Sequence, residues 1–217
     1  MFDVTLTFDN GPDRTVTPMV LDVLRREEIK ATFFVLGHKI EADPECLALA
    51  RQAHAEGHWI GNHTFTHSVP LGTMTDQAAT VAEIDRTQAL LSDVAGDEML
   101  FRPFGGGGAL GKHLLSEAAL ARLEACAFTC VLWNVVPRDW EDPETWPETA
   151  MEMIEDHDWS LVVLHDLPTG AMALLERFID MVRSAGGRFR QDFPAECVPL
   201  RRGSRMMPMT PFVNDQR

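Results

Sequence analysis

Two pairs of side chains in this 217-residue sequence combine residue types and spacing suited to hydrolytic chemistry. His63 and His67 are one helical turn apart, and this spacing allows two imidazoles to converge on one divalent cation. Such a cation with an open coordination position activates water and polarises a carbonyl group. Asp9 and Asn10 precede a Gly-Pro turn, which delivers polar groups to the rim of a core. The simpler interpretation is turn and loop residues, because Asp-Asn-Gly-Pro is also good turn chemistry.

The position of the polar groups along the chain favours the functional interpretation. Asp9 follows the apolar run 4–8, and His63 follows the short run 59–62. The same position is taken by Arg102 after 100–101, by Asp139 and Trp140 after 129–136, and by His165 after 160–164. When parallel strands point their C-terminal ends at one edge, residues at these ends meet in one active site.

Strands and helices alternate in the predicted secondary structure. The β-prone runs predict strands at 4–8, 31–36, 59–62, 100–101, 129–136 and 160–164. Helical spacing predicts helices at 17–28, 45–56, 74–94, 111–125, 171–185 and in part of 143–156. This alternation is typical of an α/β fold with a parallel sheet and right-handed crossovers, and it leaves open a doubly wound sheet or a barrel.

The length and the 45% of hydrophobic residues predict a single domain over residues 1–217. Its core is expected at about 4–190. Residues 191–217, in which prolines and methionines dominate, are expected to form a loosely ordered tail that folds against the body. The four cysteines show no spacing typical of a metal site or a disulfide framework, so we expect small core residues.

The net charge of −14 argues against nucleic acid and anionic membranes as partners and favours a neutral or zwitterionic substrate. No run approaches the roughly 18 apolar residues of a membrane span, and no basic and apolar leader precedes the first strand. The sequence therefore predicts a soluble, cytoplasmic protein. An exported protein from which a leader has been removed is the alternative, and the oligomeric state stays open.

Five sequence motifs follow one another in order: Thr7–Pro12 (Thr-Phe-Asp-Asn-Gly-Pro), His63–His67, Phe101–Gly105, Arg138–Trp140 and Leu164–Asp166. Together they resemble the motifs of polysaccharide deacetylases of the NodB-homology type, carbohydrate esterase family 4. The resemblance extends from about residue 4 to about residue 190. It implies the distorted (β/α) barrel of that family, with fewer than eight full units.

The resemblance also implies roles for four catalytic side chains. Asp9 corresponds to the catalytic base that takes a proton from the attacking water. Arg102 corresponds to the arginine that keeps this base ionised and oriented, which suits the planar fork of a guanidinium. His165 matches the general acid, and Asp139 matches the carboxylate that raises the pKa of this histidine. The alternative for Arg102 is an ordinary surface ion pair.

The metal site implied by the resemblance consists of His63, His67 and Asn10. Zinc is the expected ion, with cobalt, nickel or manganese as alternatives. Most family members have an aspartate where this sequence has Asn10. Because a neutral amide oxygen is a poorer ligand than a carboxylate, we expect weaker metal binding.

The resemblance places substrate-binding groups at Trp140, Phe104 and Gly105. Trp140 would line the sugar groove, although a tryptophan after a strand is more often a packing residue. The sequence contains no tyrosine, and Phe104 stands where many relatives have one. In the family a backbone N–H at this position binds the oxyanion, so Phe104 or Gly105 would supply it here. Val136 replaces the first aspartate of the fuller Asp-x-x-Asp-Trp motif.

The predicted function is metal-dependent hydrolysis of a non-peptide carbon–nitrogen bond, with removal of acetyl from an N-acetylated sugar or polysaccharide. A cytosolic hydrolase of small amides on the same fold is the alternative, and a cavity capped by the C-terminal tail would favour it. A long open groove beside Trp140 would favour a glycan. A non-catalytic carbohydrate-binding relative with a decayed metal site at Asn10 is the third hypothesis.

Overall fold

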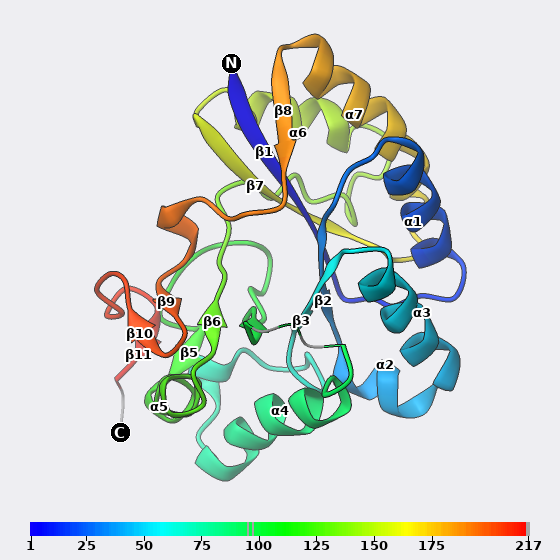
Figure 1. The fold of residues 1–217 in the computed structure, drawn as a ribbon. Helices are drawn as coiled ribbons and strands as arrows, with labels where there is room; N and C mark the ends of the chain where they lie inside the picture. The colour runs from blue at the N-terminus through cyan, green and yellow to red at the C-terminus, as the bar shows by residue number, and fades with distance from the viewer. Residues whose placement is uncertain (95, 97, 216–217) are drawn as a thin grey trace.

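The computed structural model describes residues 1–94, 96 and 98–215, and a mixed β-sheet forms its centre (Figure 1). The strand order is β10-β9-β6-β4-β3-β2-β1-β7, and β8 also pairs with β1. The strands of this sheet are β1 (Phe2–Asp9), β2 (Thr32–Val35), β3 (Trp59–Asn62), β4 (Leu100–Phe101), β6 (Thr129–Cys130), β7 (Trp159–His165), β8 (Gly187–Arg190), β9 (Leu200–Arg201) and β10 (Ser204–Arg205). A separate pair joins β5 (Leu115–Ser116) and β11 (Val213–Asn214).

Helices follow the parallel strands and lie around the outside of the curved sheet, which forms an incomplete barrel (Figure 1). The helices are α1 (Val16–Arg26), α2 (Gly37–Ala42), α3 (Pro44–Ala55), α4 (Gln77–Leu90), α5 (Glu117–Ala125), α6 (Trp146–Ile154) and α7 (Leu175–Ser184). Short 3-10 turns occur at η1 (Leu71–Thr73), η2 (Ala171–Leu174) and η3 (Ala195–Cys197). None of the helices in the described ranges is long and apolar enough to cross a membrane.

Local sequence signals set the start of three helices. The side chain of Asp43 accepts a hydrogen bond from Glu45 N–H at the start of α3. Asp76 caps α4 in the same way, and Ser116 caps α5. Each cap satisfies backbone N–H groups that have no partner within the helix.

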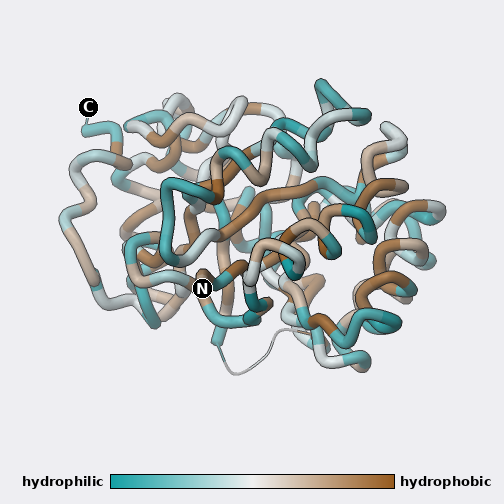
Figure 2. The backbone as a smooth tube through the Cα atoms, turned by 90° about the horizontal axis from the view of Figure 1, so that it is seen from above, coloured by the Kyte–Doolittle hydropathy of each residue, from teal (hydrophilic) through white to brown (hydrophobic). Residues whose placement is uncertain are grey.

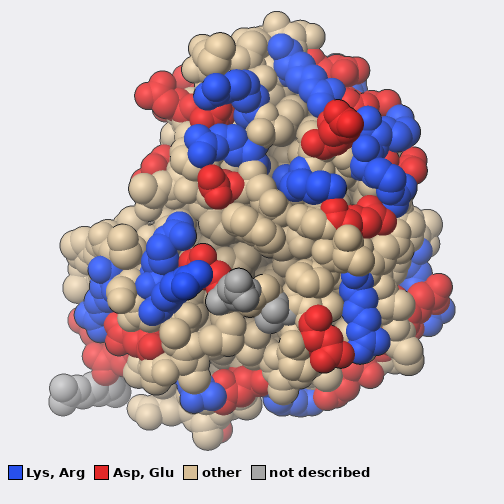
Figure 3. Space-filling model, viewed as in Figure 1, with Lys and Arg blue, Asp and Glu red and all other residues tan. Residues whose placement is uncertain are grey.

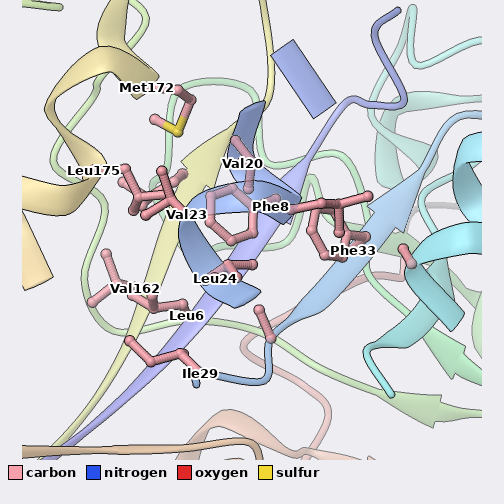
Figure 4. Close-up of a cluster of buried hydrophobic side chains, with 14 of the residues drawn as sticks. Leu6, Phe8, Val20, Val23, Leu24, Ile29, Phe33, Val162, Met172 and Leu175 are labelled. Carbon is pink, nitrogen blue, oxygen red and sulfur yellow. The ribbon is translucent and has the colours of Figure 1, made fainter. Parts of the chain in front are cut away.

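Alternation along β1 separates the core from the site. Leu6 and Phe8 point to one face, where they pack against side chains of α1 and α7 that include Val20, Leu24 and Leu175 (Figure 4). Because successive side chains of a strand point to opposite faces, Thr7 and Asp9 face the interior of the barrel. Figure 2 shows that many of the hydrophobic segments of the chain lie in the middle of the molecule.

The interior of the incomplete barrel is filled by a second apolar cluster. Phe34, Phe101, Phe128, Leu161 and Val163 belong to it, and each is almost fully buried. The cluster forms the floor beneath the C-terminal ends of the strands. Asp9 and the polar residues beside it therefore sit above an apolar layer that excludes water from below.

Several elements are shorter in the structure than predicted, such as α4 (Gln77–Leu90) against 74–94, and for two others the hydrogen bonds show the cause. The helix predicted at 111–125 begins only at Glu117, because the preceding residues 115–116 pair with β11 and Ser116 caps the helix. The strand predicted at 129–136 is regular only at 129–130, followed by a single bridge of Val135 to Val162. The reason is that the N–H groups of residues 131 and 132 bind carbonyls of two different segments.

The prediction of a loosely ordered tail was wrong within the residues that the structure describes. β9 pairs antiparallel with β6 and β10 pairs antiparallel with β9, so the main sheet is mixed and not purely parallel. β11 pairs parallel with β5 in the separate two-stranded sheet. The tail does fold against the body, as expected. Residues 216–217 lie outside the described part of the chain. β8 and α2 are further elements that the sequence analysis did not predict.

On the face of the molecule shown in Figure 3, charged side chains of both signs lie interspersed rather than segregated by sign. Many form exposed ion pairs, such as Arg26 with Glu176 at 2.7 Å and Arg51 with Asp93 at 2.8 Å. Exposed pairs of this kind contribute about 0–1 kcal/mol each. The charges that matter for the chemistry lie elsewhere, in the interior of the barrel.

Candidate active site

The predicted site residues meet at the C-terminal ends of the parallel strands. Asp9 is the last residue of β1, and His165 is the last residue of β7. His63 directly follows β3, and Arg102 directly follows β4. The pocket there has a volume of about 470 Å³. Its lining includes these predicted site residues: Asp9, Asn10, His63, His67, Phe104, Gly105, Trp140 and His165.

Asp9 is held by a buried guanidinium. Arg102 Nη1 donates to Asp9 Oδ1 at 2.8 Å and to Thr7 Oγ1 at 2.7 Å. Thr7 in turn donates its hydroxyl proton to the carbonyl of Val162 on the neighbouring strand at 2.9 Å. One oxygen of Asp9 is therefore fixed toward Arg102, and the other, Oδ2, remains available for chemistry.

Arg102 is fully buried, which excludes the alternative of an ordinary surface ion pair. Its remaining donors bind the carbonyls of Val131 and Leu132, both at 3.2 Å. The guanidinium lies 4.1 Å from the centroid of the Phe34 ring, a cation–π contact. Burial lowers the pKa of Arg102 and the charge of Asp9 raises it, and a guanidinium stays protonated in either case.

His63 and His67 are neutral and have a lone pair to offer. Burial lowers the pKa of each to about 3, and for His67 the neighbouring His63 adds to the effect. His63 Nδ1 lies 2.8 Å from the carbonyl of Arg102. Because a carbonyl only accepts, Nδ1 carries the proton and Nε2 is unprotonated. Nε2 lies 3.5 Å from Asp9 Oδ2, and the two imidazole centroids are 4.7 Å apart.

Asn10 has an unpaired oxygen in the same pocket. Its backbone has φ = 71°, a left-handed conformation that asparagine tolerates better than most residues. The buried Oδ1 of Asn10 has no hydrogen-bond partner in the structure. Within the described residues, no group of three or more His, Cys, Asp or Glu forms a metal centre. Two neutral imidazoles and a free amide oxygen nevertheless fit a divalent cation, because each offers a lone pair toward the same pocket.

His165 is oriented by Asp139, as the motif resemblance implied. His165 Nδ1 and Asp139 Oδ1 are 2.8 Å apart, and His165 N–H donates to Asp139 Oδ2 at 3.0 Å. Burial alone would lower the pKa of His165. The hydrogen bond and the charge of Asp139 outweigh this effect, the charges of Asp9 and Asp166 add smaller contributions, and the pKa of His165 is raised. Trp140 packs edge-on against this imidazole, with centroids 4.6 Å apart. His165 therefore carries a proton more readily than an ordinary histidine.

The glycine-rich loop forms one wall of the pocket. The Phe104 ring packs against His67 with centroids 3.9 Å apart and the ring planes tilted by 43°. Gly105 lies so close to Trp133 that a Cβ at this position would come within 2.6 Å of the indole. The same indole donates from Nε1 to the carbonyl of Gly108 at 2.7 Å. Trp133 thus holds the loop at both ends, a role that the sequence analysis missed because the residue stood within a predicted strand.

The mouth of the pocket carries a charged pair that the sequence analysis did not single out. Arg138 and Glu141 line the pocket and pair at 2.6 Å. Val136, which replaces an aspartate of the fuller motif, also lines it, so the wall is apolar at this point. No residue of the described tail lines the pocket, which removes the capped cavity expected for a small-amide hydrolase.

His58, which has the same i, i+4 spacing to His54 as His67 has to His63, does not line the pocket. His58 Nδ1 accepts a hydrogen bond from Ala31 N–H, and burial lowers the pKa of this histidine to about 4. The cysteines are free, as predicted. Three of them are buried core residues, as expected, and Cys126 at the end of α5 is only half-buried.

Comparison with known proteins gives the class of this chain. The family model described as polysaccharide deacetylase matches residues 2–126, more than half of the sequence. The chain belongs to the polysaccharide deacetylase family. This result confirms the family and the enzyme class that the motifs implied, and the matched residues include the first three motifs.

Individual relatives of the chain are deacetylases of bacterial polysaccharides and oligosaccharides. It is 30% identical over 196 residues to a peptidoglycan-N-acetylglucosamine deacetylase of Bacillus cereus, covering 86% of this chain and 84% of that protein. This chain is 34% identical over 165 residues to a chitooligosaccharide deacetylase of Rhizobium leguminosarum bv. trifolii, and the match covers 76% of this chain and 71% of that protein. It spans 37% of the length of the peptidoglycan-N-acetylglucosamine deacetylase PgdA of Listeria monocytogenes.

Solved structures confirm the incomplete barrel. A family 4 carbohydrate esterase from Streptomyces lividans in complex with acetate superposes with a TM-score of 0.72 at 26% identity, covering 91% of this chain and 96% of that one. A family 4 acetyl xylan esterase from Clostridium thermocellum, in complex with a cobalt ion, superposes with a TM-score of 0.69 at 28% identity, covering 87% of each chain.

Proposed function

We propose that this protein removes acetyl groups from N-acetylated sugars of a polysaccharide or oligosaccharide such as peptidoglycan or chitin fragments, with a divalent cation at His63, His67 and Asn10. The observation that carries the proposal is the convergence of two oriented groups on one pocket. Asp9 is fixed by Arg102 with Oδ2 3.5 Å from His63 Nε2, and His165 is fixed by Asp139 at 2.8 Å.

A bound divalent cation supplies Lewis-acid chemistry, which lowers the pKa of a ligated water and polarises an acyl oxygen. Zinc suits a site with two imidazoles, and the cobalt ion in a related esterase supports a divalent ion of this kind. Cobalt, nickel and manganese remain alternatives. The amide oxygen of Asn10 carries no charge, so we expect a weaker site than one with a carboxylate.

The protein side chains move the protons of the proposed reaction. Asp9 takes a proton from the water while the oxygen of this water bonds to the acyl carbon. The carbon–nitrogen bond then breaks, and His165 gives its proton from Nε2 to the departing amine, leaving acetate and the free amino sugar. Backbone N–H groups at Phe104 and Gly105 are candidates for stabilising the oxyanion, because both residues line the same pocket as His165.

The pocket favours a carbohydrate over a small amide. Its lining combines the aromatic faces of Trp140, Trp133 and Phe104 with few charged groups. Aromatic side chains provide apolar area for sugar rings. The Arg138–Glu141 pair balances charge at the mouth, which suits a neutral substrate.

Acetate release from N-acetylglucosamine oligomers and from peptidoglycan tests the proposal directly. We expect release by the wild type with added zinc or cobalt and almost none by Asp9→Ala. Equal rates in both proteins would contradict the proposed base. Absence of bound metal in protein purified without chelator, together with no hydrolysis of a broad amide panel, would favour the non-catalytic carbohydrate-binding hypothesis.

A further inference from the structure

The turn between the two candidate metal histidines has its backbone polar groups tied to the surrounding elements. Thr64 N–H donates to Asn62 Oδ1 at 3.0 Å, and Thr64 C=O accepts from Gly37 N–H at 3.1 Å. The carbonyl of Phe65 accepts from His38 N–H at 3.0 Å. The start of α2 thus binds the carbonyls of the turn. The remaining N–H groups require another partner, because unpaired backbone groups are costly when water is excluded.

The carboxylate of Glu83 on α4 is that partner. Its Oε2 accepts from Phe65 N–H at 3.0 Å and from Thr66 N–H at 2.8 Å. Its Oε1 accepts from the hydroxyl of Thr66 at 2.9 Å. In the part of the chain that the structure describes, Glu83 forms no ion pair with a lysine or arginine. All three of its hydrogen bonds therefore serve the turn.

The effect of Glu83 extends past His67. Because the Thr66 hydroxyl gives its proton to Glu83, its oxygen accepts from the Ser68 hydroxyl at 2.7 Å and from Ser68 N–H at 3.3 Å. The residues before and after His67 are thereby linked to one carboxylate. His67 itself has φ = 53°, a left-handed conformation that is energetically costly and persists only where its surroundings enforce it.

His67 depends on this turn more than His63 does. The His63 ring is anchored by the hydrogen bond from Nδ1 to the Arg102 carbonyl. Metal-binding histidines are usually oriented in this way. Among the described residues, His67 has no hydrogen-bond partner for its ring, which packs against the rings of His63 and Phe104. Its direction is therefore set by its backbone and by stacking.

We propose that Glu83 is a positioning residue for the metal site: it holds the turn 63–67 in the shape that points His67 at the cation. The inference rests on the proposed metal centre of the same site. Glu83 does not line the pocket, so it acts through the backbone and the Thr66 hydroxyl of the turn. The predicted defect of a variant is weaker metal binding, with the acid and base left in place.

Calorimetric titration of metal-free protein with Co²⁺ measures this defect without relying on activity. For Glu83→Ala we expect an increase in the Co²⁺ dissociation constant of about 10–100-fold, the usual range for residues that orient metal ligands. Glu83→Gln keeps an oxygen that can accept from the two N–H groups, so we expect a smaller increase. Asp85→Asn is the matched control, because Asp85 lies on the same helix but pairs with Arg122 at 2.7 Å away from the turn. It should bind Co²⁺ as the wild type does.

Deacetylation kinetics separate positioning from a general structural role. At saturating Co²⁺ we expect Glu83→Gln to regain most of kcat with an unchanged KM, since Asp9 and His165 are untouched. Circular dichroism and thermal unfolding check the fold, and Glu83→Gln carries the test if Glu83→Ala does not fold. Wild-type Co²⁺ affinity in a folded Glu83→Ala would overturn the role of Glu83 alone. A wild type that binds no divalent ion would overturn the metal centre and this role together.

Discussion

Asp9 and His165 are register partners on neighbouring parallel strands. The pairing of β1 with β7 aligns Asp9 with His165, two residues beyond Thr7 with Val163. Neighbouring strands lie about 4.8 Å apart, so the proposed base and acid project from adjacent positions into the same pocket. A shift of one residue in either strand would turn one of these side chains to the opposite face. The register of the sheet is therefore a condition for the proposed reaction.

Replacing Asp9 by Asn tests its role as base. We expect kcat/KM to fall by about 10²–10⁴-fold, because the amide cannot accept a proton. The buried Arg102 would lose its counter-charge, at a cost of about 1–3 kcal/mol in the free energy of unfolding. Acetate release and urea unfolding measure the two effects. Asp3→Asn at the other end of β1 is the control, and an Asp9→Asn protein as active as this control would exclude the proposed base.

Replacing Asp139 by Asn tests how the acid is tuned. Because Asp139 raises the pKa of His165, its loss lowers that pKa, and the protonated form disappears at a lower pH. The basic limb of the pH–kcat profile is expected to move to lower pH, with lower kcat at every pH. Asp142→Asn, at an exposed position before α6, is the control. An unshifted basic limb would show that His165 is not the group that limits the rate at high pH.

Changes at Asn10 test whether its amide is a metal ligand. We expect Asn10→Asp to bind Co²⁺ or Zn²⁺ more tightly, because a carboxylate is the stronger ligand and tolerates the left-handed backbone. Asn10→Gly keeps that backbone conformation and deletes the ligand, so weaker binding is expected. Titration of the metal-free proteins measures both. Identical affinities in all three proteins would place the cation away from residue 10.

A buried carboxyl next to the acid predicts an unusual pH dependence of stability. Asp166 is fully buried, and burial raises its pKa from 3.8 to about 7, although Thr17 donates to it at 2.5 Å. The folded protein therefore binds a proton that the unfolded chain releases, and the free energy of unfolding falls as the pH rises from about 4 to 7. An asparagine at position 166 does not titrate in this pH range, so its contribution to the free energy of unfolding does not change with pH.

We therefore expect Asp166→Asn to be more stable than the wild type at pH 8, by at least about 1 kcal/mol, and to lose this advantage near pH 4. Urea unfolding of both proteins at the two pH values provides the comparison. Gly11 should stay unchanged in this experiment, because a Cβ there would come within 2.1 Å of the Asp166 carboxylate. A stability difference that does not depend on pH would show that the pKa of Asp166 is not raised.

The sequence was sufficient for the strands that carry the chemistry. The continuous apolar run 160–164, for example, is β7 in the structure, with one additional residue at each end. Prediction was weaker in the second half of the chain. The helix start near 111 and the strand at 129–136 were misplaced, because pairing with the distant β11 and β9 decides the local structure there. Such long-range pairing leaves no trace in local periodicity.

The sequence by itself determined which groups take part and in what order, because residue type fixes what an imidazole, a carboxylate or a guanidinium can do. Tertiary structure alone decided how they are oriented. The proton on Nδ1 of His63, the burial of Arg102 and the hold of Glu83 on the turn each depend on a partner at least 17 residues away. Contacts over such distances are set by packing and sheet register, which no local stretch of sequence encodes.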